Sequence, residues 1–190
     1  SAIASSVIPS LISAVTEGDH KGTIRKINTS IRFTMIIALP SAAGLTALAS
    51  PIMVLLFHDA SIMPARLLQV GSVSVVFFCL STLTNGILQG IDKMKVPVRH
   101  ACIALFFHLV LLAVLLKFFD LHVYGIVYAN IAFALIVSIL NGLSLKKYLG
   151  YKQEILRTFF IPSLSSIMMG MSAFLIYRGM YMITSNNTIS

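Results

Sequence analysis

Long apolar segments separated by short charged stretches are the feature that most restricts how this chain can fold. Four segments of membrane-spanning length have no acidic or basic residue in their middle, and a helix needs about 20 apolar residues to cross the hydrocarbon core. A fifth segment is bounded by Arg99 and Lys117, whose long side chains can reach the membrane surface. The sequence therefore predicts an all-α, polytopic membrane helical bundle with five full transmembrane helices. The predicted spans lie near residues 33–57, 67–91, 98–118, 123–145 and 159–183.

The first residues of the chain are predicted to end a further helix. Residues 1–15 contain neither an initiating Met nor a helix cap, so we expect this helix to begin upstream. No linker or low-complexity stretch divides the rest of the sequence. The chain is therefore expected to be a single partial domain over residues 1–190.

Composition argues against a water-soluble fold and against nucleic acid as a partner. Apolar residues make up 57% of the chain and charged residues 11%, whereas soluble domains carry about 25% charged residues. So few charges cannot coat a core of this size, and the lipid bilayer must cover it. The net charge is +8, but the basic residues stand in short runs between apolar segments instead of on one solvated face. We therefore expect a lipid partner and no nucleic acid.

The distribution of Lys and Arg predicts how the chain is oriented. Short turns make consecutive spans antiparallel, and loops on the cytoplasmic side of a membrane collect basic residues. All but three of the 14 basic residues fall in three segments that alternate along the chain, and we expect these segments to face the cytoplasm. These three basic segments are residues 17–32, 92–99 and 146–157, and the three basic residues outside them are Arg66, Lys117 and Arg178.

The first basic segment has an apolar stripe of its own. Ile24, Ile27 and Ile31 recur at helical spacing, while the neighbouring basic residues lie off that stripe. An amphipathic helix lying on the inner leaflet and a helical extension of the next span both fit this pattern. Both alternatives make the segment an anchor instead of a catalytic element.

The predicted span at residues 67–91 carries a polar face. Ser74, Ser81, Asn85 and Gln89 follow one another at steps of seven, four and four residues, which places them on one side of a helix. Lipid would not accept this side, so it either lines a water-filled pathway or makes hydrogen bonds to other helices. Close packing through the Gly86-x-x-x-Gly90 pattern favours the second alternative.

Three further positions within predicted spans are unusual. His108 lies near the middle of a span, where an ionisable side chain is costly, and it either stays neutral in a hydrogen bond or contacts an ion or substrate. Asn130 is a weaker candidate for the lining of a cavity. Pro40 is the better of two proline candidates for a kink in the first span, because a full turn or more of helix extends on either side.

The sequence offers no set of residues for catalysis or for a metal. The six acidic residues fall in predicted loops or at span ends, and the histidines other than His108 are interpreted as peripheral. No HExxH or similar metal-ligand spacing occurs. We therefore expect neither an enzyme nor a metal site. Lys93, Lys95 and Arg99, at the inner rim, either meet anionic lipid headgroups or serve only as topology signals.

Three blocks of sequence, in this order, resemble the MviN/MurJ and SpoVB branch of the multidrug/oligosaccharidyl-lipid/polysaccharide exporter superfamily. The blocks are VIPSLISAVTEGDHKGTIRKINTSIRF, ALPSAAGLTALASPIMVLLF and LQGIDKMKVPVRHACIALFFHLVLLAVLL. The resemblance covers residues 1 to about 145 well, and the remainder is similar in position and hydropathy only. It implies the carboxyl-terminal lobe of a two-lobe transporter, with the amino-terminal lobe of the same protein as its partner.

The same resemblance implies a function. Members of this branch are multi-pass proteins of the bacterial inner membrane. They flip undecaprenyl-pyrophosphate-linked saccharides, such as the peptidoglycan precursor or a polysaccharide unit, by alternating access. No cofactor is implied, although an ion gradient or the membrane potential can drive the cycle. The family's cavity arginines belong largely to the amino-terminal lobe and have no counterpart here. An ion-coupled multidrug exporter and a noncatalytic membrane subunit of an envelope-synthesis complex remain alternatives.

Overall fold

The computed structural model describes residues 9, 12–13, 15, 18–58, 61–118, 122–151 and 156–187, and within these residues it contains helices and no strand. The prediction of an all-α fold is confirmed, and five helices are long and apolar enough to cross a membrane. Most of the predicted end of a preceding helix lies outside the described residues. The helices are α2 (His20–Ala47), α3 (Ala49–Phe57), α4 (Ile62–Gly90), α5 (Lys95–Phe118), α6 (His122–Leu149), the short π-helix η1 (Leu156–Phe160) and α7 (Ile161–Asn187).

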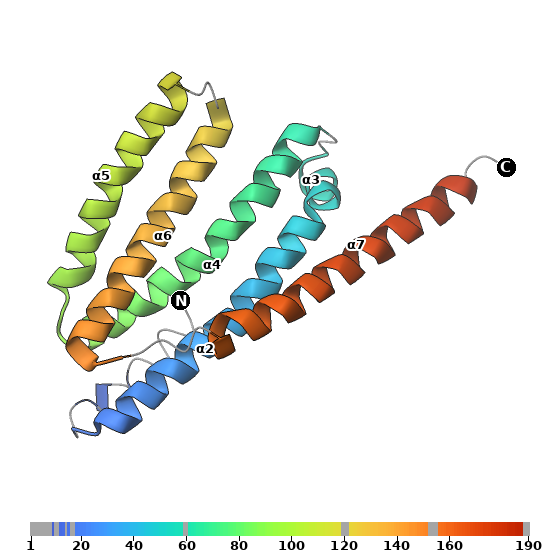
Figure 1. Cartoon of the computed structure of the whole chain (residues 1–190). Helices are drawn as coiled ribbons and strands as arrows, with labels where there is room; N and C mark the ends of the chain where they lie inside the picture. Colours follow the sequence, from blue (N-terminus) through green and yellow to red (C-terminus); the bar gives the residue numbers. More distant parts are fainter. Residues whose placement is uncertain are drawn as a thin grey trace.

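The five long helices form an open row instead of a closed bundle. Figure 1 shows them side by side in the order α5, α6, α4, α2, α7, and the main contacts pair neighbours in this row. Helix α6 therefore packs between α5 and α4, and α5 touches α4, its neighbour in sequence, only slightly. Among the described helices, α2, α4 and α6 are flanked on both sides in the row, whereas α5 and α7 are each flanked on one side.

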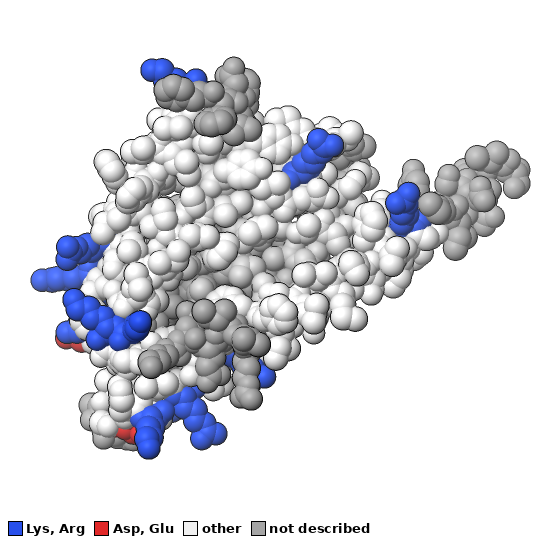
Figure 2. All heavy atoms as spheres, in the orientation of Figure 1, with Lys and Arg blue, Asp and Glu red and all other residues white. Residues whose placement is uncertain are grey.

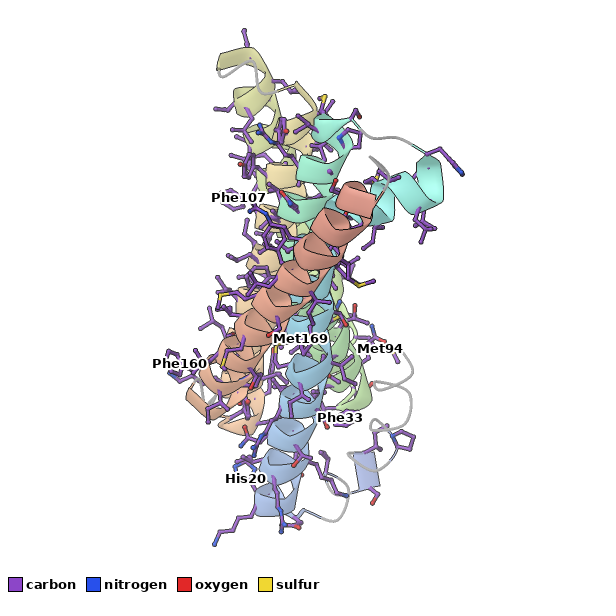
Figure 3. The ribbon with its side chains drawn as sticks, turned by 90° about the vertical axis from the view of Figure 1, so that its right-hand side faces the viewer. His20, Phe33, Met94, Phe107, Phe160 and Met169 are labelled. Carbon is purple, nitrogen blue, oxygen red and sulfur yellow. The ribbon has the colours of Figure 1, made fainter. Side chains whose placement is uncertain are left out.

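Burial follows the position in the row. In the most apolar stretch of α2 and of α4, about a third of the residues are buried inside the protein. In the corresponding stretches of α5 and α7 only 11% are buried. The outward surfaces of α5 and α7 are apolar, and Phe107 on α5 and Met169 on α7 are both exposed (Figure 3). Such surfaces are stable only against lipid or further apolar helices.

The apolar core lies near the start of α2 and the ends of α4 and α6. Ile27, Ile31 and Met35 form one stripe of α2 and are fully buried, and they belong to the same cluster as Ile87 of α4 and Leu145 of α6. The stripe therefore extends the membrane span, which settles the alternatives for residues 17–32 in favour of a helical extension. The helix starts behind Asp19, whose Oδ1 accepts a hydrogen bond from the Gly22 amide at 2.9 Å, a common N-cap arrangement.

The interruption of the first span lies near its second proline. Helix α2 continues through Pro40, so a kink at that residue stays a prediction, and the break between α2 and α3 falls at Leu48. Pro51 has no amide hydrogen for the carbonyl of Ala47, and its ring crowds that carbonyl. The chain therefore ends one helix and begins another just before Pro51.

The three basic segments meet on one side of the layer of helices, where α2 and α5 begin and where α4 and α6 end. Figure 1 places the start of α2, the α4–α5 turn and the end of α6 together, and Figure 2 shows most Lys and Arg side chains gathered there. Lys93 Nζ lies 5.6 Å from the centroid of the Tyr148 ring, which joins the turn to α6. A Cβ atom on Gly150 would lie 3.6 Å from His20 Nε2, so the end of α6 also adjoins α2. We call this end of the molecule the basic end.

The turn between α4 and α5 is a Schellman motif with an aspartate at its left-handed position. The Lys93 amide donates to Leu88 O at 2.9 Å, and the Asp92 amide donates to Gln89 O at 3.1 Å. Asp92 has a φ of 60°, a region that favours glycine and tolerates aspartate. This tight reversal makes α5 antiparallel to α4.

Candidate functional site

A hydrogen-bonded group of polar side chains joins α4, α5 and α6, and Asn141 of α6 lies at its centre. This side chain is 0% exposed. Its Nδ2 donates to Asn85 Oδ1 at 2.7 Å and to Thr84 Oγ1 at 3.1 Å, both on α4. Both amide hydrogens are thereby used. We call this group the Asn141 cluster, and its members are Thr84, Asn85, His100, Asn141 and Ser144.

The remaining bonds of the Asn141 cluster fix the tautomer of His100. Because Asn141 Oδ1 can only accept, His100 Nδ1, at 2.8 Å, must donate to it. In the neutral ring, His100 Nε2 then accepts from the Ser144 hydroxyl at 3.3 Å. Thr84 donates its own hydroxyl hydrogen within α4, to Leu80 O at 2.8 Å, and so can accept from Asn141. Every member therefore has a partner.

The Asn141 cluster lies close to the basic end. Asn85 stands five residues before the end of α4 and His100 five residues after the start of α5. At a rise of about 1.5 Å per residue, both lie about 8 Å inside the helix ends. A polar group at this depth holds three helices in register, because an unpaired amide in an apolar surrounding is costly.

The four residues of the predicted polar face of α4 differ in their burial and in their hydrogen-bond partners. Asn85 bonds to α6, as the interhelical alternative requires. Ser81 is buried and donates to Phe78 O at 3.0 Å, and half-buried Ser74 donates to Gly71 O at 2.6 Å, so both bond within α4. Gln89 is exposed at the basic end. Whether any of these side chains lines a transport cavity stays a prediction.

The two candidates in other spans also differ from each other. His108 is half-buried, and its ring meets Phe133 of α6 edge-on, with 5.9 Å between ring centroids. Its Nδ1 is buried and has no hydrogen-bond partner among the described residues. Asn130 is exposed on α6. These two side chains therefore make no hydrogen-bonded site comparable to the Asn141 cluster.

The inner-rim candidates surround the α4–α5 turn. Lys93, Lys95 and Arg99 are all exposed. Lys93 stands over the face of Tyr148, where a cation–π interaction adds about 0.5–1 kcal/mol at an exposed site. The other two side chains are free to approach a phosphate at the membrane surface.

Sequence reasoning missed the centre of the Asn141 cluster. Asn141 was not a candidate, and His100 was interpreted as peripheral, which the structure contradicts because His100 bonds to two residues of α6. A usable signal was present in SILNGLS, where Ser138, Asn141 and Ser144 recur every three residues on one side of a helix. Ser138 makes a further bond between helices, donating to Phe77 O of α4 at 2.9 Å.

Within the described residues, no group of three or more His, Cys, Asp or Glu side chains could hold a metal ion. The polar groups of the Asn141 cluster are amides, hydroxyls and an imidazole, and the neighbouring α4–α5 turn adds exposed cations. Such groups can bind a polar or anionic headgroup by hydrogen bonds and charge.

Comparisons with known proteins identify the family. A sequence model described as "Lipid II flippase MurJ" matches residues 1–187. The chain is 30% identical over 168 residues to the lipid II flippase MurJ of Bacillus subtilis, an alignment that covers 85% of this chain and 30% of that relative. It is 27% identical over 152 residues to a probable lipid II flippase MurJ of Bdellovibrio bacteriovorus, covering 77% and 29% respectively. The chain thus spans less than a third of the length of these relatives, and it belongs to the lipid II flippase MurJ family.

Proposed function

We propose that this chain is the carboxyl-terminal lobe of a transporter that flips an undecaprenyl-pyrophosphate-linked saccharide, the peptidoglycan precursor or a polysaccharide unit, by alternating access. The family is one of bacterial membrane transporters, and the match over residues 1–187 is the observation that carries the proposal. Relatives that bear the name lipid II flippase support this choice of substrate class.

The open row of helices supports the assignment of the chain to one lobe. A pyrophosphate-sugar headgroup needs a hydrated path across the hydrocarbon, whereas its polyprenyl tail can stay in lipid. One layer of helices does not enclose such a path, and the exposed apolar surfaces of α5 and α7 leave room for other helices. The amino-terminal lobe of the same protein would supply the second wall. An ion gradient or the membrane potential would drive the cycle, without a cofactor.

The basic end is proposed to face the cytoplasm. The basic segments lie together at the same ends of the helices, which fits the preference of cytoplasmic loops for Lys and Arg. In this orientation Lys93, Lys95 and Arg99 would stand at the cytoplasmic entrance and attract the anionic headgroup. The exposed amides of Gln89 and Asn130 are available to bond the saccharide.

A complementation experiment tests the proposal. The natural protein at its full length is expressed in bacterial cells depleted of their own lipid II flippase, and growth and precursor translocation are measured. We expect both to be restored. Correct insertion of the protein without restored translocation would contradict the peptidoglycan version of the proposal.

A matched pair of substitutions tests the proposed path. Gln89→Leu removes an exposed amide at the basic end of α4, and Gln69→Leu removes an exposed amide in the other half of the same helix. We expect Gln89→Leu to lower translocation and Gln69→Leu to leave it unchanged, with equal amounts of both proteins in the membrane. Equal translocation by both variants would exclude Gln89 from the path.

A further inference from the structure

An apolar groove runs along α4 and α6 at the basic end, apart from the Asn141 cluster. Its volume is about 550 Å³. Phe77 and Leu80 of α4, Ile139 and Leu143 of α6, and Phe159 of η1 contribute apolar walls, and Lys146 stands at one end. Leu80 is buried at the floor, whereas Ile139 and Leu143 are 53% and 58% exposed at the rim.

The dimensions of the groove fit a single lipid chain. Its lining extends along α6 from Lys146 to Leu135, which is about 16 Å at 1.5 Å per residue. Half of a hydrocarbon core of about 30 Å is about 15 Å, so the groove is as long as one leaflet is deep. Ile139 and Leu143 leave the rim of the groove open, so an aliphatic chain of the surrounding lipid can lie in it along this length.

The charge at the end of the groove fits an anionic headgroup. Lys146 lies in the last turn of α6, at the level where the basic segments gather. A lipid whose chain followed the groove would place its phosphate beside this lysine. Each Lys or Arg near an anionic membrane surface contributes about 1 kcal/mol of attraction.

We propose that this groove binds an acyl chain of an anionic glycerophospholipid from the leaflet at the basic end, with the lipid phosphate at Lys146. The acyl chain would cover Ile139 and Leu143, and it would fill the space between α4 and Phe159 of η1. Such a lipid would act as part of the packing between the middle of the row and the start of α7. This site does not depend on which substrate is flipped or on which side of the membrane the basic end faces.

Native mass spectrometry of the delipidated natural protein tests the proposal. Phosphatidylglycerol, phosphatidylcholine with the same chains, and undecaprenyl phosphate are titrated separately. We expect phosphatidylglycerol to bind more tightly than the other two. Equal binding of the two phospholipids would overturn the role of charge, and tighter binding of undecaprenyl phosphate at this groove would overturn the choice of a phospholipid.

Two matched pairs of variants place the lipid in the groove. Lys146→Gln is expected to weaken phosphatidylglycerol binding about fivefold, the equivalent of about 1 kcal/mol, while Lys147→Gln next to it leaves binding unchanged. Ile139→Trp fills the groove and should weaken binding by about tenfold, whereas Ile126→Trp, at an exposed position of α6 outside the groove, should not. Unfolding curves show whether the tryptophan variants fold alike. Equal effects within either pair would overturn the site.

Discussion

The helices at the two ends of the row, α5 and α7, are equally little buried and yet are attached in different ways. Helix α5 is attached to α6 by hydrogen bonds of His100 with Asn141, to which it donates, and with Ser144, from which it accepts. Helix α7 approaches α2 through a stripe of small residues instead. Pro162, Ser166 and Gly170 are buried along this stripe, and the Ser166 hydroxyl bonds back to Pro162 O within its own helix.

The difference shows two solutions to one physical problem. Helices in lipid gain little from apolar burial against one another, because lipid tails are equally apolar, so association rests on hydrogen bonds or on close approach of backbones. At Gly170, an added Cβ would lie 3.5 Å from both Cβ and O of Ala43, which shows how closely α7 approaches α2. Loss of the hydrogen bonds to Asn141 should therefore weaken the packing of α5 on α6. A larger side chain at Gly170 should weaken the packing of α7 on α2.

The largest effect is expected when the centre of the Asn141 cluster is removed. Asn141→Leu keeps the approximate size of the side chain but deletes three bonds to two neighbouring helices, and it leaves Asn85 and His100 short of partners. Bonds between membrane helices contribute about 0.6 kcal/mol each, and unpaired buried groups cost more. We expect the free energy of unfolding in mixed micelles to fall by about 2–3 kcal/mol, and hydrogen exchange of the α5 amides to rise.

The matched control is the same substitution at an exposed position of the same helix. Asn130→Leu should change the free energy of unfolding by less than about 0.5 kcal/mol, as surface substitutions usually do. If the two variants lost equal stability, the attachment of α5 by the Asn141 cluster would be refuted.

The second prediction concerns bulk at the contact between α7 and α2. Gly170→Leu must push Ala43 away and should lower the free energy of unfolding by about 2 kcal/mol, the usual cost of overpacking, with faster hydrogen exchange in α7 but not in α5. Gly170→Ala fits at ordinary contact distance and should have little effect. Gly179→Leu is the control, because a Cβ there meets no atom within 4 Å. A loss of stability in Gly179→Leu as large as in Gly170→Leu would argue against close packing.

The helical class and the number of spans could be predicted because they depend on local sequence. Apolar length and the placement of Lys and Arg are properties of continuous segments, and five candidate spans are present in the described residues. The first of them is His20–Ala47 and not residues 33–57, because the helix breaks at Leu48. The order of helices in the row could not be read in this way. Nothing in the sequence between residues 91 and 95 indicates that α5 would pack on α6 instead of on α4.

The polar site could be predicted only in part, for a similar reason. The steps between Ser74, Ser81, Asn85 and Gln89 place them on one helical face, but they do not say which helix that face meets. Asn85 found its partner on α6, while Ser74 and Ser81 bonded to their own helix. Hydroxyls can be satisfied by the carbonyl one turn back, whereas a buried amide needs partners from elsewhere. Asn and His within spans are therefore more informative than Ser.

A third, smaller effect is expected at His108, within α5 but outside the Asn141 cluster. Its buried Nδ1 has no hydrogen-bond partner among the described residues, and His108→Phe removes that nitrogen while keeping a ring against Phe133. We expect the free energy of unfolding to rise by about 1 kcal/mol. His100→Phe, on the same helix, should lower it because two bonds are lost. A loss of translocation in a stabilised His108→Phe protein would assign His108 to transport, and a loss of stability would contradict the structural argument.

The smallest effect concerns the turn that holds α5 antiparallel to α4, a second attachment in addition to the Asn141 cluster. Asp92 has a φ of 60°, where a residue with a Cβ is strained, so Asp92→Gly should raise the free energy of unfolding by about 0.5 kcal/mol. Gly150, at the end of α6, has a φ of 62° and is already glycine. Gly150→Ala should therefore have the opposite sign, and crowding does not explain it, since the nearest atom to the new Cβ would be 3.6 Å away. A fall in the free energy of unfolding for Asp92→Gly would contradict this expectation. It would mean that the aspartate side chain stabilises the turn by more than the left-handed backbone conformation costs.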